Sequence, residues 1–144
     1  MKKILLPLFS VLFLGLALNC SAVPDKNPAL QRQWMLVSFD GFTKDQLIAN
    51  KAEINLTSAM DGSKIQGSAY MGCNRMSFIS EFKKEGHIKI SKGVSTMKAC
   101  QNMDLENAFQ RKFDTMTKYS VEGHFLTLSD DQGHSMKFVA ADWD

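Results

Sequence analysis

The sequence predicts an α+β fold in which one α-helix lies on a curled antiparallel β-sheet. Several short segments alternate apolar and polar residues, tight-turn residues separate them, and a single segment repeats apolar residues at helical spacing. Neighbouring strands joined by short turns run antiparallel. The apolar stripe of a helix is buried against another layer, and here that layer is the sheet.

The segments before the helix have strand character. The clearest of them, 75–82, places Met76, Phe78 and Phe82 on one face and polar residues on the other. Such alternation is typical of a strand with one buried and one wet face. Segment 43–50 is expected to be a loop or a single turn. The expected strands in this part of the chain are 33–39, 52–57, 64–71, 75–82 and 87–91.

Residues 102–119 predict the helix. Its apolar residues recur at three- and four-residue steps and form one stripe: Leu105, Ala108, Phe109, Phe113 and Met116. Asn102 can cap the first turn, and the acidic Asp104 and Glu106 suit its positive end. Three further strands are expected after the helix, at 118–122, 124–130 and 134–140, and they form a meander with one apolar face.

The N-terminus predicts export. Residues 1–22 have a two-lysine start, an apolar run and small residues at the end, which is typical of a secretory signal peptide. The segment "ALNC" resembles a bacterial lipobox, and in that alternative Cys20 carries a lipid and anchors the chain to a membrane. The protein is therefore expected in the periplasm, or as a membrane-anchored lipoprotein. Residues 23–33 are expected to be an exposed lead-in to a domain that spans 34–144.

Two cysteines remain in the mature domain, Cys73 and Cys100. In an oxidising compartment such a pair generally forms a disulfide. Two alternatives stay open: a pair of buried free thiols that fill the core, or a thiol-dependent enzyme that uses Cys73 as its nucleophile. The distance between the two α-carbons decides between a bond and free thiols.

The other polar residues indicate little chemistry. The net charge of +2 includes no block of like charge, so no nucleic-acid partner is expected. His87, His124 and His134 follow no metal-binding spacing, although His124 and His134 could meet across the last hairpin. No metal or other cofactor is expected. Asn74 and Arg75 are candidates for an exposed binding surface, and the alternative is that Asn74 is only a turn residue.

The order of several motifs resembles the META domain family, the bacterial family of the heat-inducible protein HslJ. The resemblance lies in "GCNR" (72–75), "STMKAC" (95–100), the amphipathic helix, and "YSVEGHFLTLSDDQGHSMKF" (119–138). It implies a partly closed antiparallel sheet with one helix, in exported or membrane-anchored proteins linked to heat stress. No catalytic activity is established for that family, so the resemblance implies no catalytic residues.

These observations favour a non-enzymatic, stress-related protein of the cell envelope. It is expected to bind an envelope protein, another envelope component or a small molecule inside the curled sheet. Two alternatives from other classes stay open: the thiol-dependent enzyme that uses Cys73, and an inhibitor of a secreted hydrolase.

Overall fold

The computed structural model describes residues 26–143. The predicted signal peptide and the lipobox alternative at Cys20 lie outside the described residues. Within 26–143, no helix is long and apolar enough to cross a membrane.

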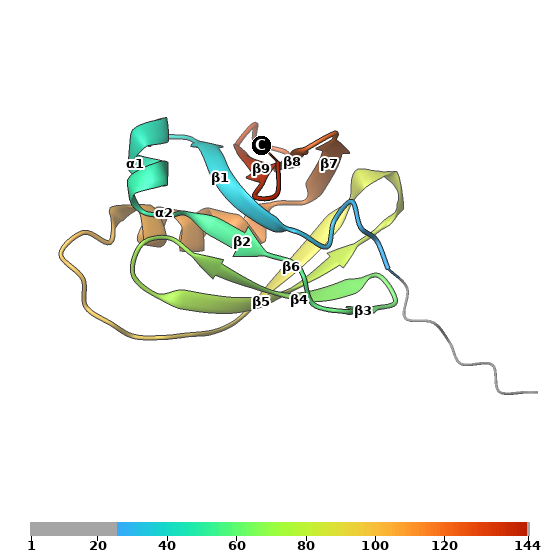
Figure 1. The fold of residues 1–144 in the computed structure, drawn as a ribbon, viewed down its shortest axis with the longest axis horizontal. Helices are drawn as coiled ribbons and strands as arrows, with labels where there is room; N and C mark the ends of the chain where they lie inside the picture. The colour runs from blue at the N-terminus through green and yellow to red at the C-terminus, as the bar shows by residue number, and fades with distance from the viewer. Residues whose placement is uncertain (1–25, 144) are drawn as a thin grey trace, which may run out of the picture.

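The structure confirms the α+β prediction. Nine antiparallel strands form one curled sheet, with the main helix packed against it (Figure 1). The strand order is β6-β5-β4-β2-β1-β9-β8-β7, and β3 pairs only with β4. The strands are β1 (Gln33–Phe39), β2 (Glu53–Asn55), β3 (Met60–Asp61), β4 (Lys64–Tyr70), β5 (Arg75–Phe82), β6 (Ile88–Ser95), β7 (Lys118–Glu122), β8 (Phe125–Ser129) and β9 (Ser135–Ala140).

The two edge strands of this sheet meet at one end. His87 and Lys118 form an isolated antiparallel bridge, and the Ile88 N–H donates to the Thr117 carbonyl at 2.9 Å. The sheet is therefore partly closed at the start of β6. The second half of β6, from Ser91 to Ser95, is exposed.

The main helix, α2 (Asp104–Lys112), is shorter than the predicted 102–119. A single 3₁₀ turn, η2 (Phe113–Thr115), continues it, and Met116 is then extended so that the chain can enter β7. Asn102 accepts a hydrogen bond from the Asp104 N–H at 3.1 Å, but the residue at the cap position itself is Met103.

Two further short helical segments complete the fold. Segment 43–50, expected to be a loop or a single turn, contains the short helix α1 (Lys44–Ala49). Thr43 and Gln46 form a capping box at its start, a sequence signal that is readable in "TKDQ". The other segment is the 3₁₀ turn η1 (Lys84–Gly86) between β5 and β6.

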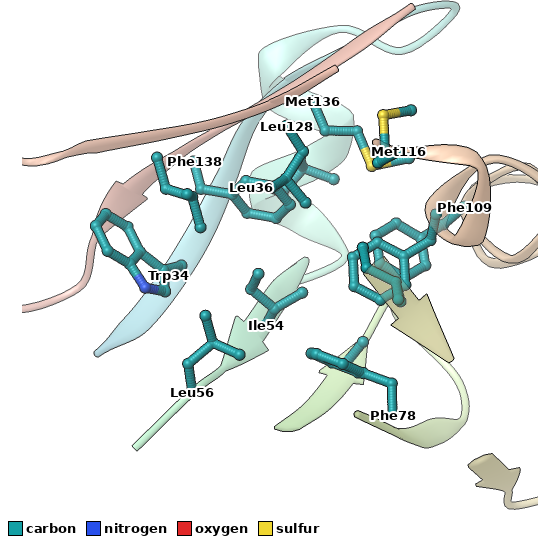
Figure 2. Close-up of a cluster of buried hydrophobic side chains, with 14 of the residues drawn as sticks. Trp34, Leu36, Ile54, Leu56, Phe78, Phe109, Met116, Leu128, Met136 and Phe138 are labelled. Carbon is teal, nitrogen blue, oxygen red and sulfur yellow. The ribbon is translucent and has the colours of Figure 1, made fainter. Parts of the chain in front are cut away.

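Aromatic side chains of the helix enter the curled sheet (Figure 2). Phe109 and Phe113 stack with their ring centroids 4.5 Å apart, and Phe113 meets the ring of Phe78 edge-on at 4.8 Å. The stripe predicted for the helix is therefore the side that packs into the core. The cavity that Phe78 and Phe113 line together with strand residues has a volume of only about 10 Å³.

The ordered domain begins earlier than expected. Leu30 lies within the predicted exposed lead-in of residues 23–33, yet its side chain is buried. The indole N–H of Trp34 donates to the Leu30 carbonyl at 3.0 Å, which fixes this segment against the core. The prediction that 23–33 is an exposed lead-in is thus wrong for Leu30, because its apolar side chain is part of the hydrophobic core.

Gly67 in β4 gives the first testable prediction. A Cβ atom at this position would lie 2.5 Å from Cζ of Phe78 and 3.0 Å from the Asn55 carbonyl oxygen. Gly67→Ala is therefore expected to lower the free energy of unfolding by about 1–3 kcal/mol, the usual cost of overpacking. Urea unfolding measures the change. The neighbouring exposed position supplies the control, Gln66→Ala, and equal stabilities of the two variants would contradict the prediction.

Candidate functional site

A disulfide joins Cys73 to Cys100, with the two α-carbons 6.1 Å apart. The prediction of a disulfide is therefore confirmed, and the alternative of two free thiols is wrong. A sulfur atom in a disulfide is not a thiolate nucleophile, so the alternative of an enzyme that uses Cys73 does not fit this arrangement. The bond ties the turn before β5 to the segment between β6 and α2.

Asn74, next to the disulfide, is buried rather than displayed. Its side chain is 5% exposed, and its amide group contacts the chain at residues 96–98. Its Oδ1 accepts hydrogen bonds from the Thr96 hydroxyl at 2.8 Å and the Lys98 N–H at 2.7 Å, and its Nδ2 donates to the Lys98 carbonyl at 3.1 Å. Asn74 is therefore a structural residue, and its prediction as part of an exposed binding surface is wrong.

Glu106 holds Asn74 from the other side. This carboxylate lies in the first turn of α2 and is only 3% exposed. One of its oxygens accepts from the Asn74 N–H at 2.6 Å and the other from Asn74 Nδ2 at 2.8 Å. Both groups of Asn74 that contact Glu106 are donors, so the position requires two acceptor oxygens. A carboxylate provides them and a glutamine amide does not. Glu106 thus fixes the orientation of the Asn74 amide.

Residues 94–103 form what we call the anchored loop, which runs from the end of β6 to the start of α2 around one end of the sheet (Figure 1). Three of its residues are attached to the turn before β5: Asn74 binds Thr96 and Lys98, and the disulfide to Cys73 holds Cys100. Thr96 also makes two hydrogen bonds with the main chain of Arg75. Its N–H donates to the Arg75 carbonyl and its hydroxyl accepts from the Arg75 N–H, both at 3.1 Å. The loop is therefore attached to the rigid sheet at alternate residues.

The residues between these attachment points face solvent. Met97, between Thr96 and Lys98, is 97% exposed, and Val94, which precedes the attachment points in β6, is 80% exposed, although both are apolar. A groove of about 520 Å³ lies between the anchored loop and α2. It is lined by Asn74, Ser95, Thr96, Met97, Lys98, Ala99, Met103, Glu106, Asn107 and Gln110. The exposed apolar side chain of Met97 thus lies at the edge of an open groove.

Arg75, the other predicted surface residue, is exposed but engaged at the start of β5. Its guanidinium lies 5.6 Å from the ring centroid of Tyr70 and 4.0 Å from the Glu53 carboxylate. Its main chain belongs to the contacts that hold Thr96. The structure thus separates the two predicted residues: the Arg75 side chain lies on the surface, and the Asn74 side chain lies under the anchored loop.

The structure does not bring the histidines together. Ala140 pairs with His124 at one end of the β8–β9 hairpin, and Asp130 pairs with His134 at the turn end. The suggestion that His124 and His134 meet across this hairpin is therefore wrong. Among residues 26–143, no three His, Cys, Asp or Glu side chains are placed to hold a metal ion.

His134 belongs to a separate polar cluster at the end of α2. Its Nδ1 lies 2.7 Å from Oδ2 of Asp130, and Lys112 Nζ lies 3.4 and 3.1 Å from its two ring nitrogens. Because Nζ is almost equally distant from both nitrogens, the ammonium lies over the ring rather than in its plane. Burial alone raises the pKa of the Asp130 carboxyl. The hydrogen bonds from His134 and Gln132 and the charge of His134 outweigh burial, so the net pKa lies below the ordinary value of 3.8.

This shift gives a pH-dependent prediction. A carboxyl whose pKa is lower in the folded state stabilises the protein above its unfolded pKa, and the stabilisation is lost as the pH falls through the folded pKa. His134→Ala removes the hydrogen bond from the ring to the Asp130 carboxyl and keeps the one from the main-chain N–H. We therefore expect a higher pKa for Asp130 in an NMR titration and acid unfolding that begins at a higher pH. His124→Ala, at the other end of the hairpin, is the control. An unchanged Asp130 titration in the His134 variant would contradict the assignment.

Comparisons with known proteins place this geometry in a family. The model of the META domain matches residues 28–143, which include the disulfide, the anchored loop and the helix. The fold is similar to that of a DUF4847 family protein from Bacteroides vulgatus, with a TM-score of 0.53 and 10% sequence identity. That similarity covers 81% of this chain and 97% of the other chain and concerns the fold alone. No curated protein sequence matches the chain. The family match spans nearly all of the described residues, and the chain belongs to the META domain family.

Proposed function

We propose that this protein is a non-enzymatic binding domain of the cell envelope that contacts a partner protein through the anchored loop. One observation carries the proposal: Met97 is almost fully exposed on a segment that is attached to the sheet on both sides of it. Covering a large apolar side chain with a partner lowers the free energy, because apolar surface is removed from water. A segment that is already fixed loses little conformational entropy when it binds.

The location and the role in stress rest on the sequence. The signal-like residues 1–22 support export, and the resemblance to the family of HslJ supports a role in envelope stress. The intact mass of the mature protein tests the location. Cleavage after Ala22 gives a chain that starts at Val23, whereas processing as a lipoprotein gives a chain that starts at a lipid-modified Cys20. We expect the unmodified chain. A mass that still contains the leader would contradict export with cleavage.

Substitution of Met97 tests the binding surface. Met97→Asp places a charge at the centre of the proposed interface. Because Met97 is 97% exposed, the substitution is not expected to disturb the packing of the domain. We expect crosslinked capture of a partner from envelope extracts of heat-shocked cells to weaken by about 30-fold or more, the effect of losing about 2 kcal/mol at an interface hot spot.

The matched control is Ile48→Asp, which changes an equally apolar, 58% exposed side chain on α1. This control is expected to capture the partner as the unmodified protein does. If both substitutions weakened capture equally, or if neither did, the anchored loop would not be the contact surface.

A further inference from the structure

We infer that the anchored loop is a substrate-like inhibitory segment that enters the active-site cleft of a secreted serine endopeptidase, with Met97 in the primary specificity pocket of that enzyme. This inference rests on the proposed function and narrows the partner to one class. Three properties of the loop carry it: the course of its main chain, the way it is held, and the chemistry of its most exposed side chain.

The main chain has the form that an endopeptidase binds. Proteins that recognise an extended peptide pair with its main chain as they would with an added β-strand. Residues 96–100 continue from the edge strand β6 without a turn or bend, and none of them has a positive φ. Every residue from 91 to 100 is exposed. An enzyme cleft can therefore reach this segment without rearranging the fold.

The attachment points lie on both sides of Met97. Asn74 holds the Thr96 hydroxyl on one side and both main-chain groups of Lys98 on the other. Because one buried side chain binds both neighbours, the main chain at Met97 is fixed from behind while its side chain is 97% exposed. A fixed loop binds with a smaller loss of entropy than a flexible substrate.

The same contacts oppose cleavage. Hydrolysis of the Met97–Lys98 peptide bond consumes one water and leaves a carboxylate on Met97 and an amine on Lys98. Asn74 continues to hold Thr96 and Lys98, and the disulfide continues to hold Cys100. The two new chain ends therefore stay close together, and cleavage gains little of the freedom that separates the products of an ordinary substrate. An extended segment held in this way acts as an inhibitor rather than a substrate.

Methionine at the exposed position indicates the type of pocket. Its side chain is unbranched, apolar and adaptable, which suits the hydrophobic slot of a chymotrypsin-type enzyme. The pocket of trypsin contains a carboxylate and requires a cationic side chain. The pocket that accepts Met97 is therefore an apolar one.

Inhibition assays with purified enzymes test the inference, with chymotrypsin and subtilisin as the apolar-pocket probes and trypsin as the cationic-pocket probe. We expect the unmodified protein to inhibit at least one apolar-pocket enzyme and to leave trypsin active. Met97→Asp is expected to weaken that inhibition by at least 100-fold. Met97→Lys is expected to transfer inhibition to trypsin. Ile48→Asp is the control that keeps the original inhibition.

Cleavage assays supply a second readout. We expect the Met97–Lys98 bond of the unmodified protein to survive with a chymotrypsin-type enzyme and to be cut in Asn74→Ala, where the two sides of Met97 are no longer held. Mass spectrometry under reducing conditions detects the fragments. Equal cleavage of the two proteins would overturn the inference.

The inference would also be overturned if the unmodified protein inhibited neither apolar-pocket enzyme, or if Met97→Lys did not inhibit trypsin. Its failure differs from failure of the proposed function. If Met97→Asp still abolished capture of a partner while no endopeptidase was inhibited, the binding surface would stand and the partner would belong to another class. If Met97→Asp left capture unchanged, both proposals would be wrong.

Discussion

Replacing Asn74 with alanine is expected to lower the free energy of unfolding by about 2–4 kcal/mol. The substitution removes hydrogen bonds to Thr96, Lys98 and Glu106 at once. A buried polar group that loses its partner costs about 1–3 kcal/mol, and a charged one costs more. The largest share of the loss falls on Glu106, because its carboxylate stays buried with one of its two partners gone. Denaturant unfolding of the oxidised protein measures the change.

Two further variants test this explanation. Arg75→Ala alters the adjacent exposed side chain and is expected to change stability by less than about 0.5 kcal/mol. Glu106→Gln keeps the shape of the side chain but places an NH₂ group against a donor of Asn74, so it is expected to destabilise despite its size. The Asn74 and Glu106 substitutions share one interaction and should not be additive when combined. Additive effects would show that the two side chains act independently, contrary to this account.

Removing the disulfide is the second large effect that we expect. The bond closes a loop with a sequence separation of 27. In the chain-entropy model a loop of this length stabilises the folded state by about 3.5 kcal/mol. The double variant Cys73→Ala and Cys100→Ala is expected to lose about this amount and to leave no unpaired thiol in the domain. Thermal and denaturant unfolding of the mature chain measure it.

A reductant provides the matched comparison. It should lower the stability of the unmodified protein by a similar amount and have no effect on the double variant. If the unmodified protein unfolded at the same denaturant concentration with and without reductant, the disulfide would not stabilise the domain.

Eight of the nine strands could be predicted from the sequence because each of these carries its own signal, whereas the two-residue β3 was not predicted. The apolar alternation in 75–82 corresponds to β5, and the segment 33–39 is β1. The predicted helix is too long because the apolar stripe continues through Phe113 and Met116. Phe113 lies in a 3₁₀ turn, and Met116 has an extended conformation. Spacing alone does not distinguish these conformations from an α-helix. The short α1 was missed although the capping box of Thr43 and Gln46 was readable.

The site was only partly predictable. The pairing of Cys73 with Cys100 followed from two cysteines in a chain with a predicted export signal. The role of Glu106 was missed, although the sequence carries a signal for it: Glu106 lies three residues before Phe109 and seven before Phe113, on the same stripe of the helix. A carboxylate on a buried stripe indicates a buried partner. The identity of that partner, Asn74, depends on contacts between distant segments that local patterns do not contain.

Amide hydrogen exchange at Lys98 tests the central claim most directly, because its N–H donates to Asn74 Oδ1 at 2.7 Å within an otherwise exposed loop. We expect this amide in the oxidised protein to exchange much more slowly than an unstructured amide, and to exchange rapidly in Asn74→Ala under conditions where that variant is folded. Rapid exchange at Lys98 in the unmodified, oxidised protein would contradict the account, since the loop would then not be held in place for a partner.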